Sequence, residues 1–388
     1  MIRRMQFCRF KSLDDATLDV GSVNLLIGAN AAGKSNLIRG FRFIADAIRA
    51  DVETAIAPLG GTEGASFWGG GQPSFSIEME YYVPDPTAPR SRSDMSYRIQ
   101  VGEHDGRPAV LAEELRIKQR RDERGRPKVW LTAKLGRGQA VKDPSNSERE
   151  PFDTGDPGVL ALKALGFLEA YPRIRALRRF VESWQFLSVS LESVRAPRRD
   201  MRADTLEFDA ANLVNVLRTL RDTPTYGAIL QDLHGLITSI ERIETAVDRG
   251  RVSLLLKEEA FSDPVEVLSV SDGTLRLLAL LTALHLMPEH AVLCVEEPEH
   301  GIHPLLFGPL LDLVRERCPS DGARQAILTT HSPDLVDAAE PHEVVTVERD
   351  QKGRTLLVRP DPRKLRKWIE DFRLGELWRM RQLGGVPR

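Results

Sequence analysis

The sequence predicts an α/β protein with a mixed sheet, an antiparallel β meander as one lobe and a helical insertion in the middle of the chain. Three patterns support this fold class. An apolar run at residues 23–27 is followed by a Gly-rich loop and by helical spacing to about residue 50. Segments of alternating apolar and polar residues recur over residues 75–135, which is typical of an antiparallel meander. From residue 251 onward, apolar strand candidates, the first at residues 252–257, alternate with helices, as in a largely parallel sheet.

The Gly-rich loop matches the pattern G-x-x-x-x-G-K-[ST] at every position. Gly28 and Gly33 permit a tight turn whose backbone N–H groups point at phosphate oxygens, and the next helix adds the positive end of its dipole. Lys34 is expected to reach the β- and γ-phosphates, and the Ser35 hydroxyl to bind Mg²⁺. The predicted nucleotide contacts are Gly28, Ala29, Asn30, Ala31, Ala32, Gly33, Lys34, Ser35 and Asn36.

The composition is that of an ordinary globular protein, with 41% hydrophobic and 28% charged residues. The formal net charge of −2 provides no overall attraction to nucleic acid, so such contacts require local basic patches. Three cysteines without C-x-x-C spacing indicate a reducing compartment. Because no apolar run approaches the length of a membrane span, we expect a cytoplasmic protein with no membrane partner.

We expect three regions along the chain. Residues 1–136 form an N-terminal lobe with the Gly-rich loop and the meander. Residues 137–250 combine a linker with the helical insertion, since residues 137–157 are rich in Gly, Asp, Pro, Ser and Glu. Residues 251–388 form a C-terminal lobe. Helical spacing in the middle region covers residues 159–182, 212–221 and 226–240.

Acidic residues follow the apolar strand candidate at residues 291–295. In enzymes with a phosphate loop, a carboxylate at such a strand end holds Mg²⁺ or its water, and a neighbouring one polarises the attacking water. We therefore assign Glu296 to the metal and Glu297 to the water. The alternative is a solvated acidic turn.

Two further segments are candidates for the same site. Residues 271–276 precede an apolar helix, where Ser271 could equally serve as an N-cap. His331 ends the apolar strand candidate at residues 325–329, where it could hydrogen-bond a γ-phosphate or be a structural histidine.

In chain order, the phosphate loop, S-D-G-T-L-R, E-E-P-E-H-G-I-H-P and T-T-H-S-P resemble the ATP-binding-cassette (ABC) ATPases of the chromosome-maintenance type. The nearest group contains the RecF-like proteins and the overcoming-lysogenization-defect-like predicted ATPases. The resemblance implies a P-loop NTPase fold of ABC type and two ATPase lobes, with the signature, Walker B strand and switch histidine in the C-terminal one. The catalytic residues would be Glu297, His331 and Lys34.

The resemblance also implies a head that dimerises on ATP, with the signature of one copy facing the nucleotide of the other. The signature residues would be Ser271, Asp272, Gly273 and Thr274. The sequence departs from the family's pattern at two points. Glu296 replaces the Asp that the family favours, and the glutamine that usually links the lobes has only weak candidates in Gln72 and Gln185.

The function expected is Mg²⁺-dependent ATP hydrolysis in DNA maintenance or phage defence. Because only about 55 residues follow His331, fewer than a usual domain, nuclease chemistry would need a separate nuclease-like effector. Basic clusters at residues 116–128, 195–202 and 363–367 could bind DNA, or could be solvated faces. The alternative function is a slow ATP-gated scaffold that sequesters or releases a partner protein.

Overall fold

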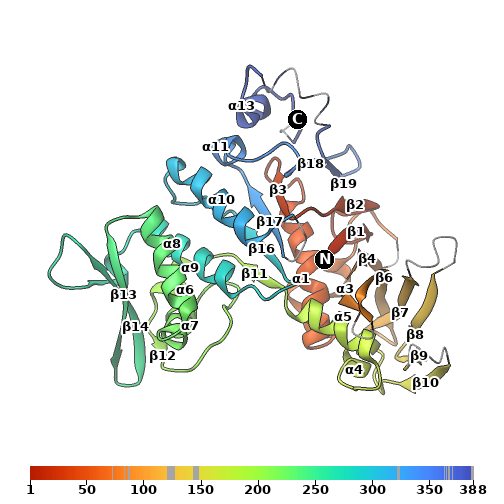
Figure 1. Ribbon diagram of the computed structural model, residues 1–388. Helices are drawn as coiled ribbons and strands as arrows, with labels where there is room; N and C mark the ends of the chain where they lie inside the picture. Colours follow the sequence, from red (N-terminus) through yellow and green to blue (C-terminus); the bar gives the residue numbers. More distant parts are fainter. Residues whose placement is uncertain are drawn as a thin grey trace.

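The computed structural model describes the chain except for residues 72, 83, 86–87, 120–126, 143–147, 321–323, 362, 364, 366–367, 369 and 386–388. Figure 1 shows a central sheet between two outlying parts, an antiparallel sheet on one side and a helical region with a long hairpin on the other. The C-terminal elements cover one end of the central sheet.

The central sheet contains the strand that precedes the phosphate loop. Its order is β11-β16-β17-β3-β18-β19, with parallel pairing from β11 to β18 and an antiparallel last pair. The prediction that the phosphate-loop strand shares a sheet with later strands is confirmed. The strands are β3 (Val23–Ile27), β11 (Gln185–Leu187), β16 (Val292–Glu296), β17 (Gln325–Thr330), β18 (Val344–Arg349) and β19 (Thr355–Val358).

The helices of this part use their apolar faces for packing, as the spacing predicts. In α1, Leu37, Phe41, Ile44 and Ile48 are all buried. The helices are α1 (Lys34–Arg49), α9 (Asp272–Leu286), η3 (Pro304–Leu306), α10 (Phe307–Arg317), α11 (Pro333–Asp337) and α13 (Leu374–Arg379).

The antiparallel sheet has the order β10-β9-β8-β7-β6-β4-β1-β2, with β5 beside β6. It confirms the meander and extends it, because β9 and β10 occupy residues for which the sequence predicts a linker; that part of the prediction is wrong. β9 and β10 are polar because residues at alternating positions of these two strands are exposed to solvent. The strands are β1 (Ile2–Cys8), β2 (Ala16–Asp19), β4 (Phe75–Tyr81), β5 (Pro84–Asp85), β6 (Ala88–His104), β7 (Arg107–Gln119), β8 (Lys128–Lys134), β9 (Arg137–Val141) and β10 (Arg149–Asp153).

Short helices join this sheet to the centre, and the expected helical region at residues 159–182 is two helices. Aromatic rings fill the junction: Trp184 lies 5.6 Å from Phe41 and 5.7 Å from Phe180 between ring centroids. The helices are α2 (Val52–Ile56), η1 (Ala57–Leu59), α3 (Gly61–Ala65), α4 (Ala161–Leu165) and α5 (Pro172–Glu182).

The middle region contains helices and a separate small sheet of order β12-β14-β13, with β15 beside β14. The strand expected at residues 252–257 belongs to this antiparallel sheet and not to the parallel one, because β13 and β14 pair as a hairpin that turns at Arg249 and Gly250, both at positive φ. The elements are α6 (Leu191–Arg195), β12 (Arg198–Arg199), α7 (Leu213–Leu220), α8 (Pro224–Leu236), β13 (Ile240–Asp248), β14 (Arg251–Glu258), β15 (Val265–Glu266) and η2 (Val267–Ser269).

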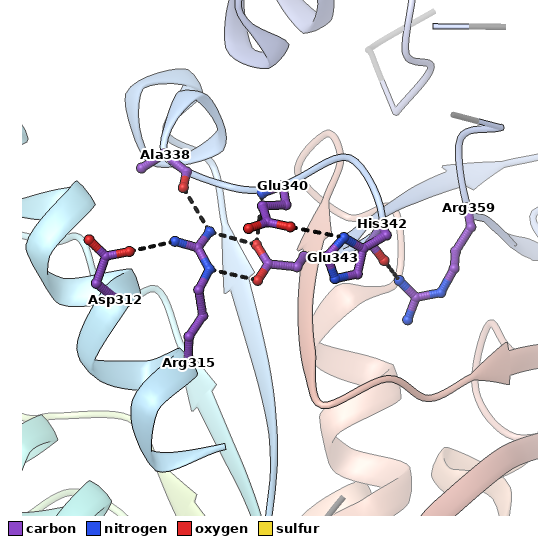
Figure 2. Close-up of polar contacts among 7 residues, drawn as sticks. All are labelled: Asp312, Arg315, Ala338, Glu340, His342, Glu343 and Arg359. Carbon is purple, nitrogen blue, oxygen red and sulfur yellow. Dashed lines mark hydrogen bonds and ion pairs between the residues drawn. The ribbon is translucent and has the colours of Figure 1, made fainter. Parts of the chain in front are cut away.

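An ion-pair network fixes α10 against the start of β18 (Figure 2). Arg315 donates two hydrogen bonds of 2.8 Å to the carboxylate of Glu343, which also accepts the backbone N–H of Glu340 at 2.8 Å. The same guanidinium donates to Asp312 and to the carbonyl of Ala338. Because the Glu343 side chain is buried, its carboxylate depends on these donors.

The C-terminal segment packs onto the protein itself. Trp378 is buried, its Nε1 donates to the carbonyl of Gly385, and α13 is tied to α11 by a hydrogen bond from Gly375 N to Asp337. Trp368 remains 42% exposed. Parts of the predicted basic clusters at residues 116–128 and 363–367 lie outside the described residues. No helix in the described ranges is long and apolar enough to cross a membrane.

Candidate functional site

The phosphate loop connects the buried strand β3 to the first turn of α1. Its backbone takes positive φ at Ala31 (61°) and Gly33 (120°), the second of which favours glycine. Gly28 cannot carry a side chain, because a Cβ there would lie 2.3 Å from the carbonyl oxygen of Val347 on β18. Local geometry therefore explains both glycines of the motif.

The loop opens onto a cavity of about 420 Å³. Loop and helix residues from Asn30 to Asn36 line it on one side. Arg39 of α1 also lines it, and the other lining residues come from distant parts of the chain: Trp68, Glu297, His331 and Arg349. The cavity thus brings together the predicted loop, water-polarising acid and histidine.

Lys34 is 5% exposed and lies along the loop. Its Nζ donates to the carbonyls of Gly28 (2.6 Å) and Ala29 (3.1 Å) and lies 3.5 Å from Nδ1 of His331. Burial lowers the pKa of Lys34 to about 8, while the nearby carboxylates of Glu297 and Glu299 act in the opposite direction. An anion in the cavity would favour the charged form.

Glu296, the last residue of β16, receives a side-chain hydrogen bond from Ser35. Burial raises the pKa of Glu296, and the positive charges of Arg39 and Arg42 oppose this shift. The two residues predicted to hold Mg²⁺ are therefore adjacent, and both supply the oxygen ligands that this ion prefers. Among the described residues, no group of three or more His, Cys, Asp or Glu side chains could hold a metal, so the remaining ligands would be phosphate oxygens and water.

Glu297 lies between two histidines. Its Oε1 is 3.3 Å from Nε2 of His331 and its Oε2 is 3.0 Å from Nε2 of His300. Its backbone is held at a φ of 49°, and its N–H donates to the carbonyl of Thr329 at 3.1 Å. Burial, and then the charge of Lys34, lower the pKa of His331, so the neutral imidazole is favoured at neutral pH.

Glu299 is a site residue that the sequence analysis did not assign. It is 7% exposed, and its Oε1 accepts hydrogen bonds from Oγ1 of Thr330 (2.5 Å) and the backbone N–H of His331 (2.9 Å). Its Oε2 is buried without a hydrogen-bond partner in the described structure. The only signal in the sequence is its place in the acidic run after β16.

The residues predicted as the signature lie at the start of α9 and do not line the cavity described above. Ser271 is the N-cap: its Oγ accepts the N–H of Thr274 at 3.2 Å. Asp272 pairs with Arg195 at 2.7 Å, and a Cβ on Gly273 would lie 2.3 Å from the carbonyl oxygen of Gly301. Their contact with nucleotide stays a prediction.

Gln185, one of the two candidates for the glutamine between the lobes, does not lie at the end of β11 that is next to Glu296. Gln185 begins this strand and donates to the carbonyl of Leu286, whereas Leu187 pairs with Val295, next to Glu296. The parallel register thus places Ser188 level with Glu296. Gln72 lies outside the described residues.

The profile of a family described as AAA domain, putative AbiEii toxin, Type IV TA system matches residues 23–337. No curated protein matches the chain. Among solved structures, an SMC head bound to the C-winged helix domain of ScpA has a TM-score of 0.58 at 15% identity, covering 94% of this chain and 99% of that one.

Two other solved SMC heads match with lower TM-scores. One is from Thermotoga maritima (0.43, 13% identity, 93% and 99% coverage), and the other is a head with an extended coiled coil bound to the C-terminal domain of ScpA derived from Pyrococcus furiosus (0.48, 12% identity, 95% and 98%). The fold predicted from the sequence, that of an ABC-type P-loop ATPase head, is confirmed by the first match.

Proposed function

Because the chain belongs to the family described as AAA domain, putative AbiEii toxin, Type IV TA system, we propose that it is a Mg²⁺-dependent ATP hydrolase that works as a homodimer closed on ATP. One observation carries the hydrolase assignment: Glu297 and His331 are paired in the cavity that the phosphate loop lines. A carboxylate at this place is suited to accept the proton of an attacking water.

The residues of the site have distinct roles in this proposal. Glu297 orients the water and takes its proton, and the histidine on each side holds its carboxylate in place. When nucleotide binds, the single N–H of neutral His331 passes from Glu297 to the γ-phosphate while His300 keeps its contact with Glu297, and Lys34 turns from the loop carbonyls to the phosphates. Ser35 and Glu296 would hold Mg²⁺, which when bound draws negative charge from the phosphate oxygens.

A second copy would complete the site. Ser271 and Gly273 lie outside the cavity lining, at the beginning of α9, where the N–H groups of a helix N-terminus attract anions. In the dimer that the sequence resemblance implies, this end of α9 faces the γ-phosphate held by the other copy.

The test is the Glu297→Gln variant. We expect it to bind ATP, to accumulate as a dimer and to release phosphate at least ~100-fold more slowly, which is the range for loss of a general base. Light scattering after gel filtration, with and without ATP, measures the dimer. Lys34→Ala should lose nucleotide affinity, and Ser271→Arg should block dimerisation while monomers still bind ATP. Hydrolysis by Glu297→Gln at the wild-type rate would refute the assignment.

The biological role we propose is DNA maintenance or phage defence with a nuclease-like effector. The alternative is a slow ATP-gated scaffold, and an SMC head seen bound to a winged-helix domain of ScpA is a structural precedent for partner binding by this fold. DNA binding that requires ATP and weakens with salt favours the first role. Absence of DNA binding, with an ATP-controlled partner protein co-purifying with Glu297→Gln, favours the second.

A further inference from the structure

The hairpin of β18 and β19 lies beside β3, the strand that leads into the phosphate loop (Figure 1). The carbonyl oxygen of Val347 lies 2.3 Å from the position that a Cβ on Gly28 would take. Oγ1 of Thr355 lies 2.1 Å from the corresponding position on Gly33 and donates to the carbonyl of Ala32 at 2.9 Å. The hairpin therefore contacts the loop near both of its ends.

Arg349 is in the same hairpin, directly opposite Thr355 in the antiparallel ladder. Two directly opposed residues have their side chains on the same face of a sheet. Since Thr355 lies against the phosphate loop, the side chain of Arg349 is also on the loop side. It lines the same cavity as residues 30–36.

The guanidinium of Arg349 has no protein partner in the described part of the chain. Its Nε is buried without an acceptor, a costly arrangement for a charged donor. The neighbouring Arg354 differs, because its Nε is paired with Asp350 at 2.7 Å. Of these two arginines of the hairpin, the one that lines the cavity thus has a buried donor without an acceptor, and the one outside the cavity lining is paired.

We propose that Arg349 binds the polyphosphate of the nucleotide. This inference rests on the proposed function, since it takes ATP as the occupant of the cavity. The planar guanidinium presents paired N–H donors that match phosphate oxygens. Lys34 supplies a cation from α1, and Arg349 supplies a second one from the C-terminal hairpin.

Titration calorimetry on the full chain tests the assignment, with a non-hydrolysable ATP analogue and inorganic tripolyphosphate as separate ligands. Arg349→Met should weaken both ligands by ~10-fold or more, the effect of losing a charge-assisted hydrogen bond. Arg349→Lys should recover part of the loss. Arg354→Met, in the same hairpin but paired away from the cavity, is the matched control and should bind like the wild type.

A folded Arg349→Met variant with unchanged affinity for both ligands overturns the proposal, and so does a loss confined to the ATP analogue, which would place the contact on the base or ribose. If Arg349→Met does not fold, the affinities of Arg349→Lys and Arg349→Gln for the two ligands are compared instead. Equal affinities of these two variants overturn the proposal. A wild-type protein that binds ATP without hydrolysing it contradicts the proposed hydrolase and leaves this binding test valid.

Discussion

Glu299 offers a direct test of how His331 is positioned. Its carboxylate is the acceptor for Oγ1 of Thr330 and for the backbone N–H of His331. Glu299→Ala removes this acceptor, whereas Glu299→Gln keeps a carbonyl oxygen at the same place without the charge. Comparing the two variants separates the hydrogen bonds from the charge.

The magnitude follows from the two contacts. A hydrogen bond to a charged group contributes about 1.5–3 kcal/mol. Part of that loss is offset in Glu299→Ala, because the variant no longer buries Oε2 without a partner. A net loss of about 2 kcal/mol in the transition state lowers kcat by roughly 30-fold. KM should change much less, because Glu299 does not line the cavity.

Steady-state ATPase rates across pH are the assay. The charge of Glu299 raises the pKa of His331, so its removal lowers that pKa further. Activity that needs neutral His331 should then persist to lower pH in Glu299→Gln than in the wild type. Asp334→Ala is the control, because its ion pair with Arg379 is exposed. Wild-type kcat in Glu299→Ala would refute the positioning role, and an acid limb that does not move in Glu299→Gln would refute the effect of the Glu299 charge on His331.

Two other predictions concern the scaffold of the site. Arg315→Met should lower the free energy of unfolding by about 3 kcal/mol in urea titrations, because it leaves the buried carboxylate of Glu343 with one backbone donor. Asp312→Asn removes the exposed partner of the same arginine and should cost at most ~1 kcal/mol; equal losses would contradict this account. Gly33→Ala should lose ATP affinity because its Cβ meets Thr355 and because a φ of 120° is strained for alanine. Adding Thr355→Ala removes the first cause alone and should restore part of the affinity; no recovery would mean that the backbone strain accounts for the loss.

The residues recovered from the sequence are those at the ends of buried parallel strands. Ile27, Glu296 and Thr330 end β3, β16 and β17, and the carboxyl ends of neighbouring parallel strands meet at one edge of the sheet. Local patterns therefore sufficed to predict that the loop, the acids and His331 lie near one another, and their roles stay predictions. Arg349 was not predicted, because its place depends on the register of a hairpin that no short motif records.

The errors have a similar origin. The linker prediction failed because β9 and β10 are polar strands at the sheet edge, where pairing, and not side-chain hydrophobicity, defines the strand. The strand at residues 252–257 was placed in the wrong sheet because its partner β13 has too few buried residues to be recognised by alternation. Sequence pattern identifies buried strands well and assigns edge strands poorly.

The residues that the sequence did not predict act on different groups around the cavity. Val347, Thr355 and Arg349 belong to one hairpin and touch or face the phosphate loop, whereas Glu299 touches the backbone of His331. The hairpin can therefore affect how tightly phosphate is held without moving His331. Glu299 can affect the reaction without changing the loop. Binding and hydrolysis should accordingly respond to different substitutions, although both depend on the edge of one sheet.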